Sequence, residues 1–314
     1  MKYSFFFIMI FFSSYSFSQT TEKFYDYKWN VCEPGAARFY STTTKTDSGY
    51  VENDYFIHEK KLQMTGKYED EACKIRNGWF YWFHPNGNIN SYGKYVHNKR
   101  EGLWISYHAN GMMSDSTLYE NGKVTGTSIS WYPNGYMRDS SVVSSNGSMI
   151  SVGWFDNGNL SSAGRYNNED KKTGVWQFFH SNGKLSAKEW YDNGKLINKE
   201  YYDEKGIAEA DTASKDRDAD YPGGIKNWTN YLSSNCIFPP QFQIVNADKA
   251  VVVVSFSVDE EGKTGNIEIT TPFYPDFDRI AVNAIKNSKR WKPAINHNRK
   301  VKFYMSQPLV FSQE

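Results

Sequence analysis

The sequence predicts a mainly β protein: an elongated single-layer antiparallel sheet of hairpin repeats, followed by a small α+β domain. Three observations carry this prediction. An Asn-Gly pair recurs five times at intervals of 24, 24, 23 and 25 residues, and aromatic residues, 17% of the 314, recur at fixed positions within that period. After residue 220 the period ends and helical patterns appear. The five pairs are Asn86-Gly87, Asn110-Gly111, Asn134-Gly135, Asn157-Gly158 and Asn182-Gly183.

The first 18 residues have the features of a secretory signal peptide. Lys2 precedes an apolar run over residues 5–12, and Ser16 and Ser18 stand at −3 and −1 of a cut before Gln19. We therefore expect residues 1–18 to be removed on export. An uncleaved membrane anchor is the second interpretation, although residues 5–17 fall short of the roughly 20 apolar residues that span a bilayer.

Residues 19–77 carry three strand-like stretches, residues 37–43, 49–57 and 62–68, separated by turn-forming residues. Their spacing does not follow the 24-residue period. Because the terminal units of repeat proteins are usually atypical, we expect this segment to begin the sheet as an irregular cap.

Residues 78–205 hold about five repeats, each predicted to be a β-hairpin. Asn-Gly favours a type I′ turn, because both central residues of that turn need positive φ. A second turn closes most repeats. Residues at even spacing share one face of a strand, so the large, small, small, large order after each Asn-Gly predicts stacking of neighbouring hairpins. Three residues before each Asn stands a large aromatic residue: Phe83, Tyr107, Trp131, Trp154 and Phe179. The second turns are Asn98-Lys99, Asn121-Gly122, Asn146-Gly147, Asn167-Asn168 and Asn193-Gly194.

Residues 206–220 lack aromatic residues and are highly charged, which predicts a linker. Beyond it, residues 221–314 predict a small domain in the order helix, strand, strand, helix, strand. The first helix should carry Ile225, Trp228, Tyr231 and Leu232 on one face, and the strand over 251–258 should direct every second residue inward. The last strand, residues 301–308, alternates apolar and polar side chains.

The repeat pattern, G-x-W-x-x-Y-x-x-N-G-x-L followed by Y-x-N-G-K, resembles the MORN-variant repeats of antitoxin-like and bacterial envelope proteins. The resemblance covers roughly residues 78–205. It implies a scaffold or a binding surface, because members of this family are mostly described in those roles.

The tail, residues 221–314, resembles the C-terminal domain of TonB, which transmits inner-membrane energy to outer-membrane receptors. The matching stretches are Phe238-Pro239-Pro240, the hairpin V-V-V-V-S-F-S-V-D-E-E-G-K, and Lys289-Arg290-Trp291-Lys292-Pro293. This resemblance implies capture of a receptor peptide by strand addition at a sheet edge. The candidate edge residues are Val301, Lys302, Phe303, Tyr304, Met305 and Ser306.

The chain also departs from TonB, which needs an uncleaved anchor and a long Pro-rich spacer. We therefore expect a non-catalytic scaffold or binding protein of the periplasm or outer-membrane periphery of a Gram-negative-type bacterium. Its expected partner is an envelope protein or an outer-membrane receptor peptide, in a role linked to TonB-dependent transport. The alternatives are a TonB-type energy transducer with an uncleaved N-terminus and, with least support, an envelope hydrolase.

Three cysteines bear on the redox compartment. Export would place them in oxidising surroundings. Cys32 and Cys73 share the N-terminal segment and could form one disulfide, which leaves Cys236 as a small buried residue.

No catalytic, metal or cofactor signature stands out in the sequence. His84, His108 and His180 share one repeat position, but the same position is Tyr132 and Phe155 in the two intervening repeats. A structural zinc site needs four ligands that converge on the metal, so we interpret these histidines as residues on the surface of the repeats. The net charge of +1 gives no basic face for nucleic acid. We expect no small-molecule substrate, no cofactor and no enzymatic activity.

Overall fold

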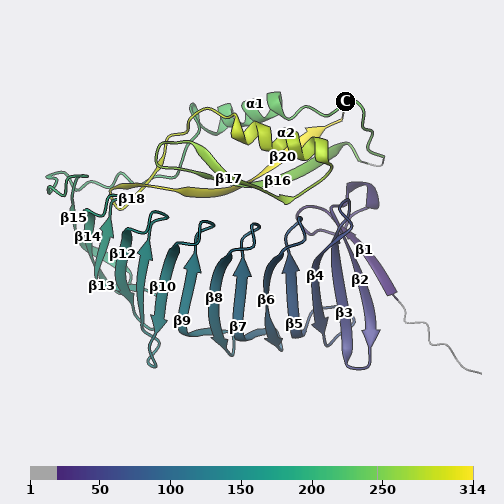
Figure 1. Ribbon diagram of the computed structural model, residues 1–314, viewed down its shortest axis with the longest axis horizontal. Coiled ribbons are helices and arrows are strands. Elements are labelled where there is room, and N and C mark those ends of the chain that lie inside the picture. The colour runs from purple at the N-terminus through teal and green to yellow at the C-terminus, as the bar shows by residue number, and fades with distance from the viewer. Residues whose placement is uncertain (1–19, 246, 314) are drawn as a thin grey trace, which may run out of the picture.

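The computed structural model describes residues 20–245 and 247–313, and the expected signal peptide lies outside this range. The predicted fold class is confirmed. Fifteen strands form one antiparallel sheet in strict chain order from β1 to β15, and the C-terminal domain lies along one long rim of this sheet (Figure 1). The strands are β1(Thr20–Tyr25), β2(Phe39–Thr46), β3(Gly49–Phe56), β4(Lys61–Tyr68), β5(Arg76–Phe83), β6(Ile89–Val96), β7(Lys99–Tyr107), β8(Met113–Glu120), β9(Lys123–Trp131), β10(Met137–Val143), β11(Met149–Trp154), β12(Leu160–Tyr166), β13(Lys172–Phe179), β14(Leu185–Asp192) and β15(Lys195–Tyr201).

The three stretches expected in residues 19–77 correspond to β2, β3 and β4, and β1 adds a further strand that the sequence pattern did not indicate. All four pair continuously with one another and with β5, so the segment continues the same sheet. A short 3-10 helix, η1(Pro34–Ala36), connects β1 to β2.

One row of residues crosses the sheet and contains three of its large buried rings, Phe80, Trp104 and Trp176. Most neighbours in this row are paired in the strand registers. The steps from Gly93 to Trp104 and from Gly164 to Trp176 fall at register shifts and are close contacts instead. Where the row has a glycine, the ring of the next strand lies flat over it. The central row consists of Thr43, Glu52, Gly66, Phe80, Gly93, Trp104, Thr117, Ser128, Ser141, Ser151, Gly164, Trp176 and Glu189.

The ring-on-glycine contacts leave no room for a side chain. A Cβ on Gly93 would lie 2.2 Å from the indole of Trp104, and one on Gly164 would lie 2.1 Å from that of Trp176. Each indole also donates Nε1–H to a backbone oxygen of the covered strand, that of Lys94 at 3.2 Å and of Arg165 at 3.0 Å. These contacts bury the large rings although the sheet has only one layer.

Charged side chains and neighbouring tyrosines complete the burial of these rings. The guanidinium of Arg100 lies 4.5 Å from the ring centre of Trp104, and Lys172 lies 4.9 Å from that of Trp176. Tyr95 meets Trp104 edge to face at 4.9 Å. The resulting cluster spans neighbouring strands, so no single repeat can bury its own rings.

The five repeat turns differ from the prediction. Their glycines have φ between 83° and 94°, but the preceding asparagines keep negative φ. In the first of these turns, Gly87 N–H donates to the oxygen of His84 and His84 N–H to that of Asn88, each at 2.8 Å. This is a three-residue loop with a left-handed glycine, so a type I′ turn was the wrong expectation here.

Type I′ geometry occurs instead in several of the second turns. At Asn121-Gly122 φ is 52° and 83°, and at Asn193-Gly194 it is 48° and 84°. The second turn of the first repeat lies at His97-Asn98, with φ of 47° and 66°, one residue before the expected position.

The asparagine of each repeat turn bonds the next repeat. Its Nδ2 donates to a backbone oxygen of the following turn at 2.8 to 2.9 Å in all five copies. The shared histidines act in the same way: Nε2 of His84, His108 and His180 contacts the oxygen of Tyr107, Trp131 and Tyr202. Tyr132 uses its hydroxyl instead. In the described chain, no group of three His, Cys, Asp or Glu side chains could hold a metal.

The C-terminal domain packs two helices on one face of a three-stranded sheet of order β17-β16-β20. Val252, Val254, Phe256 and Val258 face the helices and are at most 1% exposed, as the alternation predicts. Of the four apolar residues expected on one face of the first helix, Trp228 is buried, whereas Ile225 is 76% exposed at the start of the helix. The elements are α1(Gly224–Asn235), β16(Lys249–Val258), β17(Thr264–Thr271), α2(Pro275–Lys286), β18(Ala294–Asn296), β19(Arg299–Val301) and β20(Phe303–Ser312).

The sequence pattern missed the hairpin β18–β19. It turns at His297-Asn298, with φ of 54° and 60°, and it ends at Val301, inside the single strand expected over residues 301–308. The supposed linker is also partly ordered: Arg217 exchanges backbone hydrogen bonds with Ile295, and Asp220 with Lys292.

The structure shows Cys32 and Cys73 as free thiols. The Cys32 N–H bonds Phe24, which faces Tyr40 on β2, whereas the sulfur of Cys73 lies 3.9 Å from the hydroxyl of Thr43. Tyr40 and Thr43 are three residues apart on β2, which is about 10 Å along the strand. A disulfide needs the two cysteines to approach more closely than this. A bridge between them stays a prediction that requires the segment to shift.

Two carboxylates of β3 are buried on the face of the sheet that carries the central row. Glu52 and Asp54 are 8% and 6% exposed, and the hydroxyl of Ser41 donates to Asp54. Burial, with a smaller effect of Glu52, raises the pKa of Asp54 to about 7.

We predict that Gly93→Ala lowers the free energy of unfolding by about 1–3 kcal/mol, because its Cβ must displace the Trp104 ring. Urea unfolding measures this change. Gly265→Ala is the control, since the nearest atom to its Cβ lies 3.7 Å away. The loss at Gly93 should shrink when Trp104→Ala is also present; an undiminished loss in that background would show that the ring contact is not its cause.

We predict that Asp54→Asn stabilises the protein above pH 7. The folded state keeps Asp54 protonated up to its pKa of about 7, while the unfolded state ionises near the ordinary value of 3.8. Stability of the unmodified protein therefore falls as pH rises through this window. The gain should be on the order of a few kcal/mol above pH 7 and vanish below pH 4. The exposed Asp47→Asn is the control in thermal unfolding, and an equal effect of both substitutions at all pH values would contradict the prediction.

Candidate partner-binding surfaces

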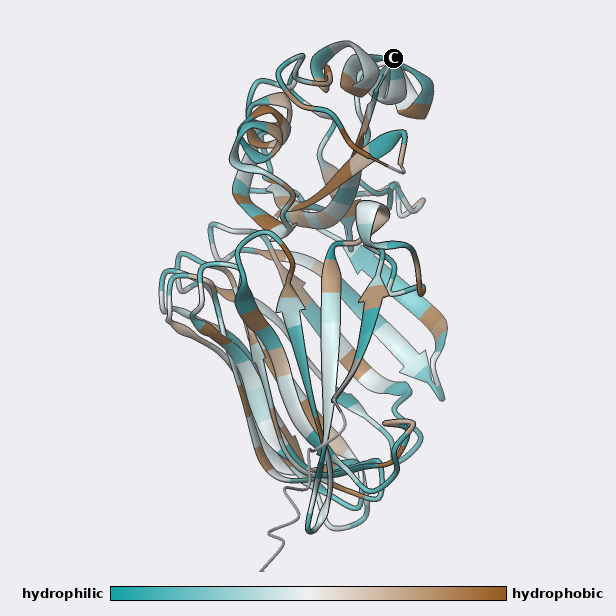
Figure 2. Cartoon of the chain, turned by 90° about the vertical axis from the view of Figure 1, so that its right-hand side faces the viewer, coloured by the Kyte–Doolittle hydropathy of each residue, from teal (hydrophilic) through white to brown (hydrophobic). Residues whose placement is uncertain are grey.

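Apart from the hairpin β18–β19, the C-terminal domain rests on the row of repeat turns, above the rim of the sheet (Figures 1 and 2). Hydrogen bonds and ion pairs join the two parts near β2–β5 and again near β11–β15. These two attachment points determine how the candidate edge is presented.

The first attachment uses one buried arginine and two histidines. Arg38 donates Nε–H to the oxygen of Val251 at 3.1 Å, and its guanidinium lies 4.1 Å from the ring centre of Phe273. Burial lowers the pKa of Arg38 to about 10. His58 packs on Phe273 as well, and His84 pairs with Glu268 of β17 at 3.0 Å.

The second attachment is the hairpin tip, residues 297–299. It packs against the face of the repeats that carries the central row. The imidazole of His297 stacks on Phe178 with ring centres 3.5 Å apart. Its Nδ1 lies 2.9 Å from the carboxylate of Glu189, whose side chain is 3% exposed. The hydrogen bond with His297 lowers the pKa of Glu189 against the effect of burial. Asn298 donates to the oxygen of Tyr202 at 3.2 Å.

Arg299 is the most deeply buried cation of the hairpin tip, at 9% exposure. It donates to the backbone oxygens of Ser161 and Phe179 and to the Ser161 hydroxyl. Its guanidinium also lies 5.1 Å from the ring centre of Phe155. Burial lowers the pKa of Arg299 to about 10. Among the described residues no carboxylate lies within ion-pair distance of it.

The six predicted edge residues divide between two elements. Val301 ends β19, Lys302 forms the connection, and residues 303–306 begin β20. Lys302 pairs with Asp156 of the repeats. β20 pairs with β16 along its whole length, and among the described residues no strand lies on its other side. The structure therefore brings the predicted residues to a sheet edge, but it ties the first of them to the repeat turns.

Alternation shows which backbone groups of β20 face away from β16. In an antiparallel pair, every second residue directs its N–H and C=O outward. Pro308 has no N–H to contribute to the ladder, and the Met305 oxygen lies 3.5 Å from the Ser255 hydroxyl on β16. Both facts assign the outward groups to Tyr304, Ser306 and Pro308. Tyr304 is 49% exposed.

A cavity of about 150 Å³ lies between the start of this edge and the repeats. Val301, Lys302 and Tyr304 form one side, and Tyr132 and Phe155 belong to the other. Arg138, Arg299, Asp156 and Glu260 also contribute to the lining, so charges of both signs are present.

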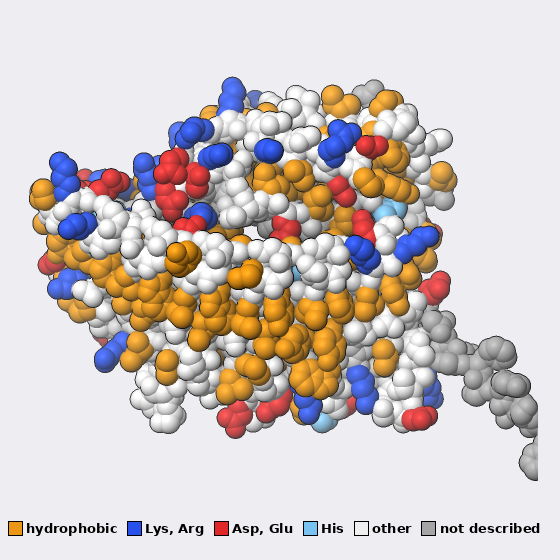
Figure 3. All heavy atoms as spheres, viewed as in Figure 1, with side chains coloured by type: hydrophobic (Ala, Val, Ile, Leu, Met, Phe, Trp, Pro, Cys, Tyr) orange, Lys and Arg blue, Asp and Glu red, His pale blue; other side chains and the backbone are white. Residues whose placement is uncertain are grey.

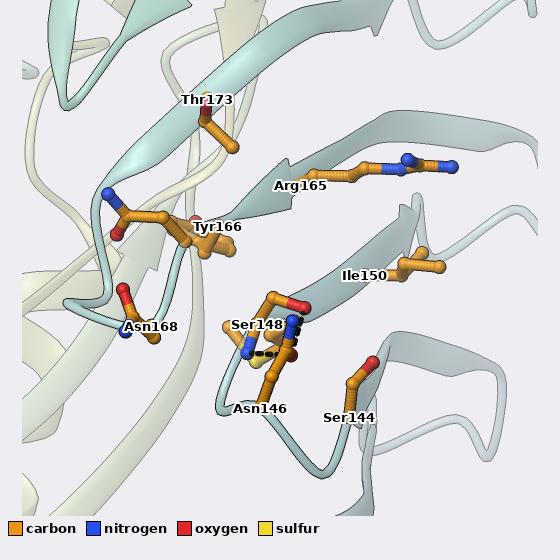
Figure 4. A pocket seen from close by; sticks show the side chains of 10 residues that line it. Ser144, Asn146, Ser148, Ile150, Arg165, Tyr166, Asn168 and Thr173 are labelled. Atoms are coloured by element: carbon orange, nitrogen blue, oxygen red, sulfur yellow. Dashed lines mark hydrogen bonds between the residues drawn. The ribbon is translucent and has the colours of Figure 1, made fainter.

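The repeats also expose apolar side chains over a broad area (Figure 3). Many of these side chains lie on the face of the sheet that does not carry the central row. Strand registers pair Leu103 with Leu118 and Val142 with Ile150 on this face, while Trp79 pairs with Lys94 and Ile150 also with Arg165. A shallow groove of about 550 Å³ crosses β11–β13 at their ends remote from the C-terminal domain, where Asn146 accepts from Ser148 (Figure 4). Among the described residues that line this groove, Arg165 carries a charge. The exposed apolar residues of this face include Trp79, Leu103, Leu118, Val142, Ile150 and Val175.

Two protein families match parts of the chain. Residues 240–312 match the family described as Gram-negative bacterial TonB protein C-terminal. Residues 100–121, 172–189 and 186–204 match the MORN repeat variant. A search of curated proteins finds no match to this chain.

The chain thus contains MORN-variant repeats and a TonB C-terminal domain, as the two resemblances indicate. These families are non-catalytic, and together they suggest a non-enzymatic protein of the cell envelope or of a transport system. None of the helices in residues 20–245 and 247–313 has the length and apolar content needed to cross a membrane.

Proposed function

We propose that this protein is a non-catalytic scaffold of the cell envelope whose C-terminal domain captures an extended partner peptide by strand addition to β20. The observation that carries the proposal is the unpaired edge of β20. Such an edge presents a row of free backbone donors and acceptors to an incoming strand. The expected partner is an envelope protein or an outer-membrane receptor peptide, in a process linked to TonB-dependent transport.

Side chains flanking the edge could add specificity to the backbone hydrogen bonds. Tyr304, Ser306 and Pro308 are exposed on the face turned toward the repeats, and Phe303 and Met305 are half-buried on the helix side. A bound strand would contact both sets alternately, since its own side chains also alternate. The repeats then act as the platform that positions this edge.

The proposal places the protein in the periplasm or at the outer-membrane periphery after removal of residues 1–18. A TonB-type energy transducer is the second candidate, which the match of residues 240–312 favours. That function would require an N-terminus that stays in the membrane.

We predict that a photo-crosslinking amino acid at position 304 yields an adduct with an envelope protein in cells. Ser306→Pro should reduce this yield about tenfold, because it removes one outward N–H that the partner strand would bond. Ser306→Ala keeps that N–H and should crosslink normally. Mass spectrometry of the adducts identifies the partner, and equal yields for the Pro and Ala variants would refute strand addition at this edge.

We predict that the mature protein starts at Gln19, which N-terminal sequencing after fractionation of the cells checks. A protein recovered from the membrane with Met1 or Lys2 at its N-terminus would instead support the energy transducer.

A further inference from the structure

We propose that the hairpin tip, residues 297–299, is a latch that holds the C-terminal domain closed on the repeats and restricts access to the start of the β20 edge. This regulation rests on the function proposed above. Figure 1 shows the hairpin β18–β19 extending from the C-terminal domain to the repeat strands around β12–β15. Each of the three residues of the tip makes polar contacts with the repeats.

The contacts of the latch are polar and charged, in contrast to the apolar core of the domain itself. Arg299 bonds backbone oxygens, and its Nε has no hydrogen-bond partner among the described residues. His297 and Glu189 form a pair that is nearly buried. Buried charges gain little net free energy on pairing, because both must first lose water. Such an interface is suited to opening without loss of the folds on either side.

The connections around the latch permit this movement. Within the part of the chain that the structure describes, residues 210–216 form hydrogen bonds and ion pairs only inside the linker, such as Asp211 to Ala213. Arg217 and Asp220 pair with the hairpin side of the domain. The hairpin and the domain would therefore move together, with the linker as the flexible connection and the attachment at Arg38 as the pivot.

Closure covers the first residues of the edge. Lys302 is held by Asp156, and Val301 and Tyr304 face Tyr132 and Phe155 across a cavity of about 150 Å³. A strand of ordinary width lies about 5 Å from its neighbour, so the repeat turns restrict its approach at residues 301–304. Ser306, Pro308 and Val310 are exposed and stay accessible. Release of the hairpin tip exposes the whole edge.

The test compares Arg299→Ala and Glu189→Gln with the control Lys300→Ala, which removes an exposed charge from the same strand. Hydrogen exchange of the full-length protein reports opening. We expect amides of residues 294–301 to exchange about tenfold faster in both latch variants, and those of β16 to stay protected, which shows that the domain remains folded. Lys300→Ala should exchange like the unmodified protein.

The same variants are then combined with the crosslinker at position 304. We expect the latch variants to raise the yield of the envelope adduct severalfold. Unchanged exchange in Arg299→Ala would overturn the latch. Faster exchange with an unchanged yield would overturn its control of the edge while leaving strand capture intact. Faster exchange with no adduct in any variant would refute strand capture itself, and with it the regulation.

Discussion

The repeat sheet depends on the packing of aromatic rings over glycines of the neighbouring strand. A single-layer sheet has no second layer to cover its large side chains. Phe80, Trp104 and Trp176 are nonetheless buried, because each lies on a backbone that carries no Cβ at that point. The glycine and the ring always belong to different strands, so this packing makes neighbouring strands depend on one another.

The end of the central row explains how the C-terminal domain is held. The row places Glu189 beside Trp176, where the pattern of rings and glycines stops. His297 of the hairpin tip pairs with this carboxylate and stacks on Phe178. The sheet therefore supplies both the platform and the contact that fixes the domain, and the edge of β20 is presented in a defined position above the turns.

The sequence predicted the sheet, the repeat period and the domain order well, because these depend on local alternation and turn chemistry. It did not predict the geometry of the repeat turns, since Asn86 and its counterparts serve to bond the next turn and not to adopt positive φ. The hairpin β18–β19 was missed because each of its strands has three residues, too few for a period. The signal that could have revealed it is Asn296-His297-Asn298, a turn-forming run between short alternating segments.

The contacts of Arg299 could not be predicted from the sequence at all. Its partners, Ser161 and Phe179, lie 138 and 120 residues away and are contacted mainly through backbone oxygens, which no side-chain pattern reports. The six candidate edge residues were predicted through a family resemblance. The structure adds that the first of them are tied to the repeats.

Native-state hydrogen exchange across the repeats is the most direct test of ring-on-glycine packing. Beyond Trp104 the row changes from rings to hydroxyls, at Thr117, Ser128, Ser141 and Ser151. Thr117 of β8 still pairs with Trp104. If the rings hold neighbouring strands together, amides of β5–β8 should open with one common and high free energy, while those of β9–β11 should open more easily. Equal or stronger protection of β9–β11 would show that the rings are not what stabilises the sheet.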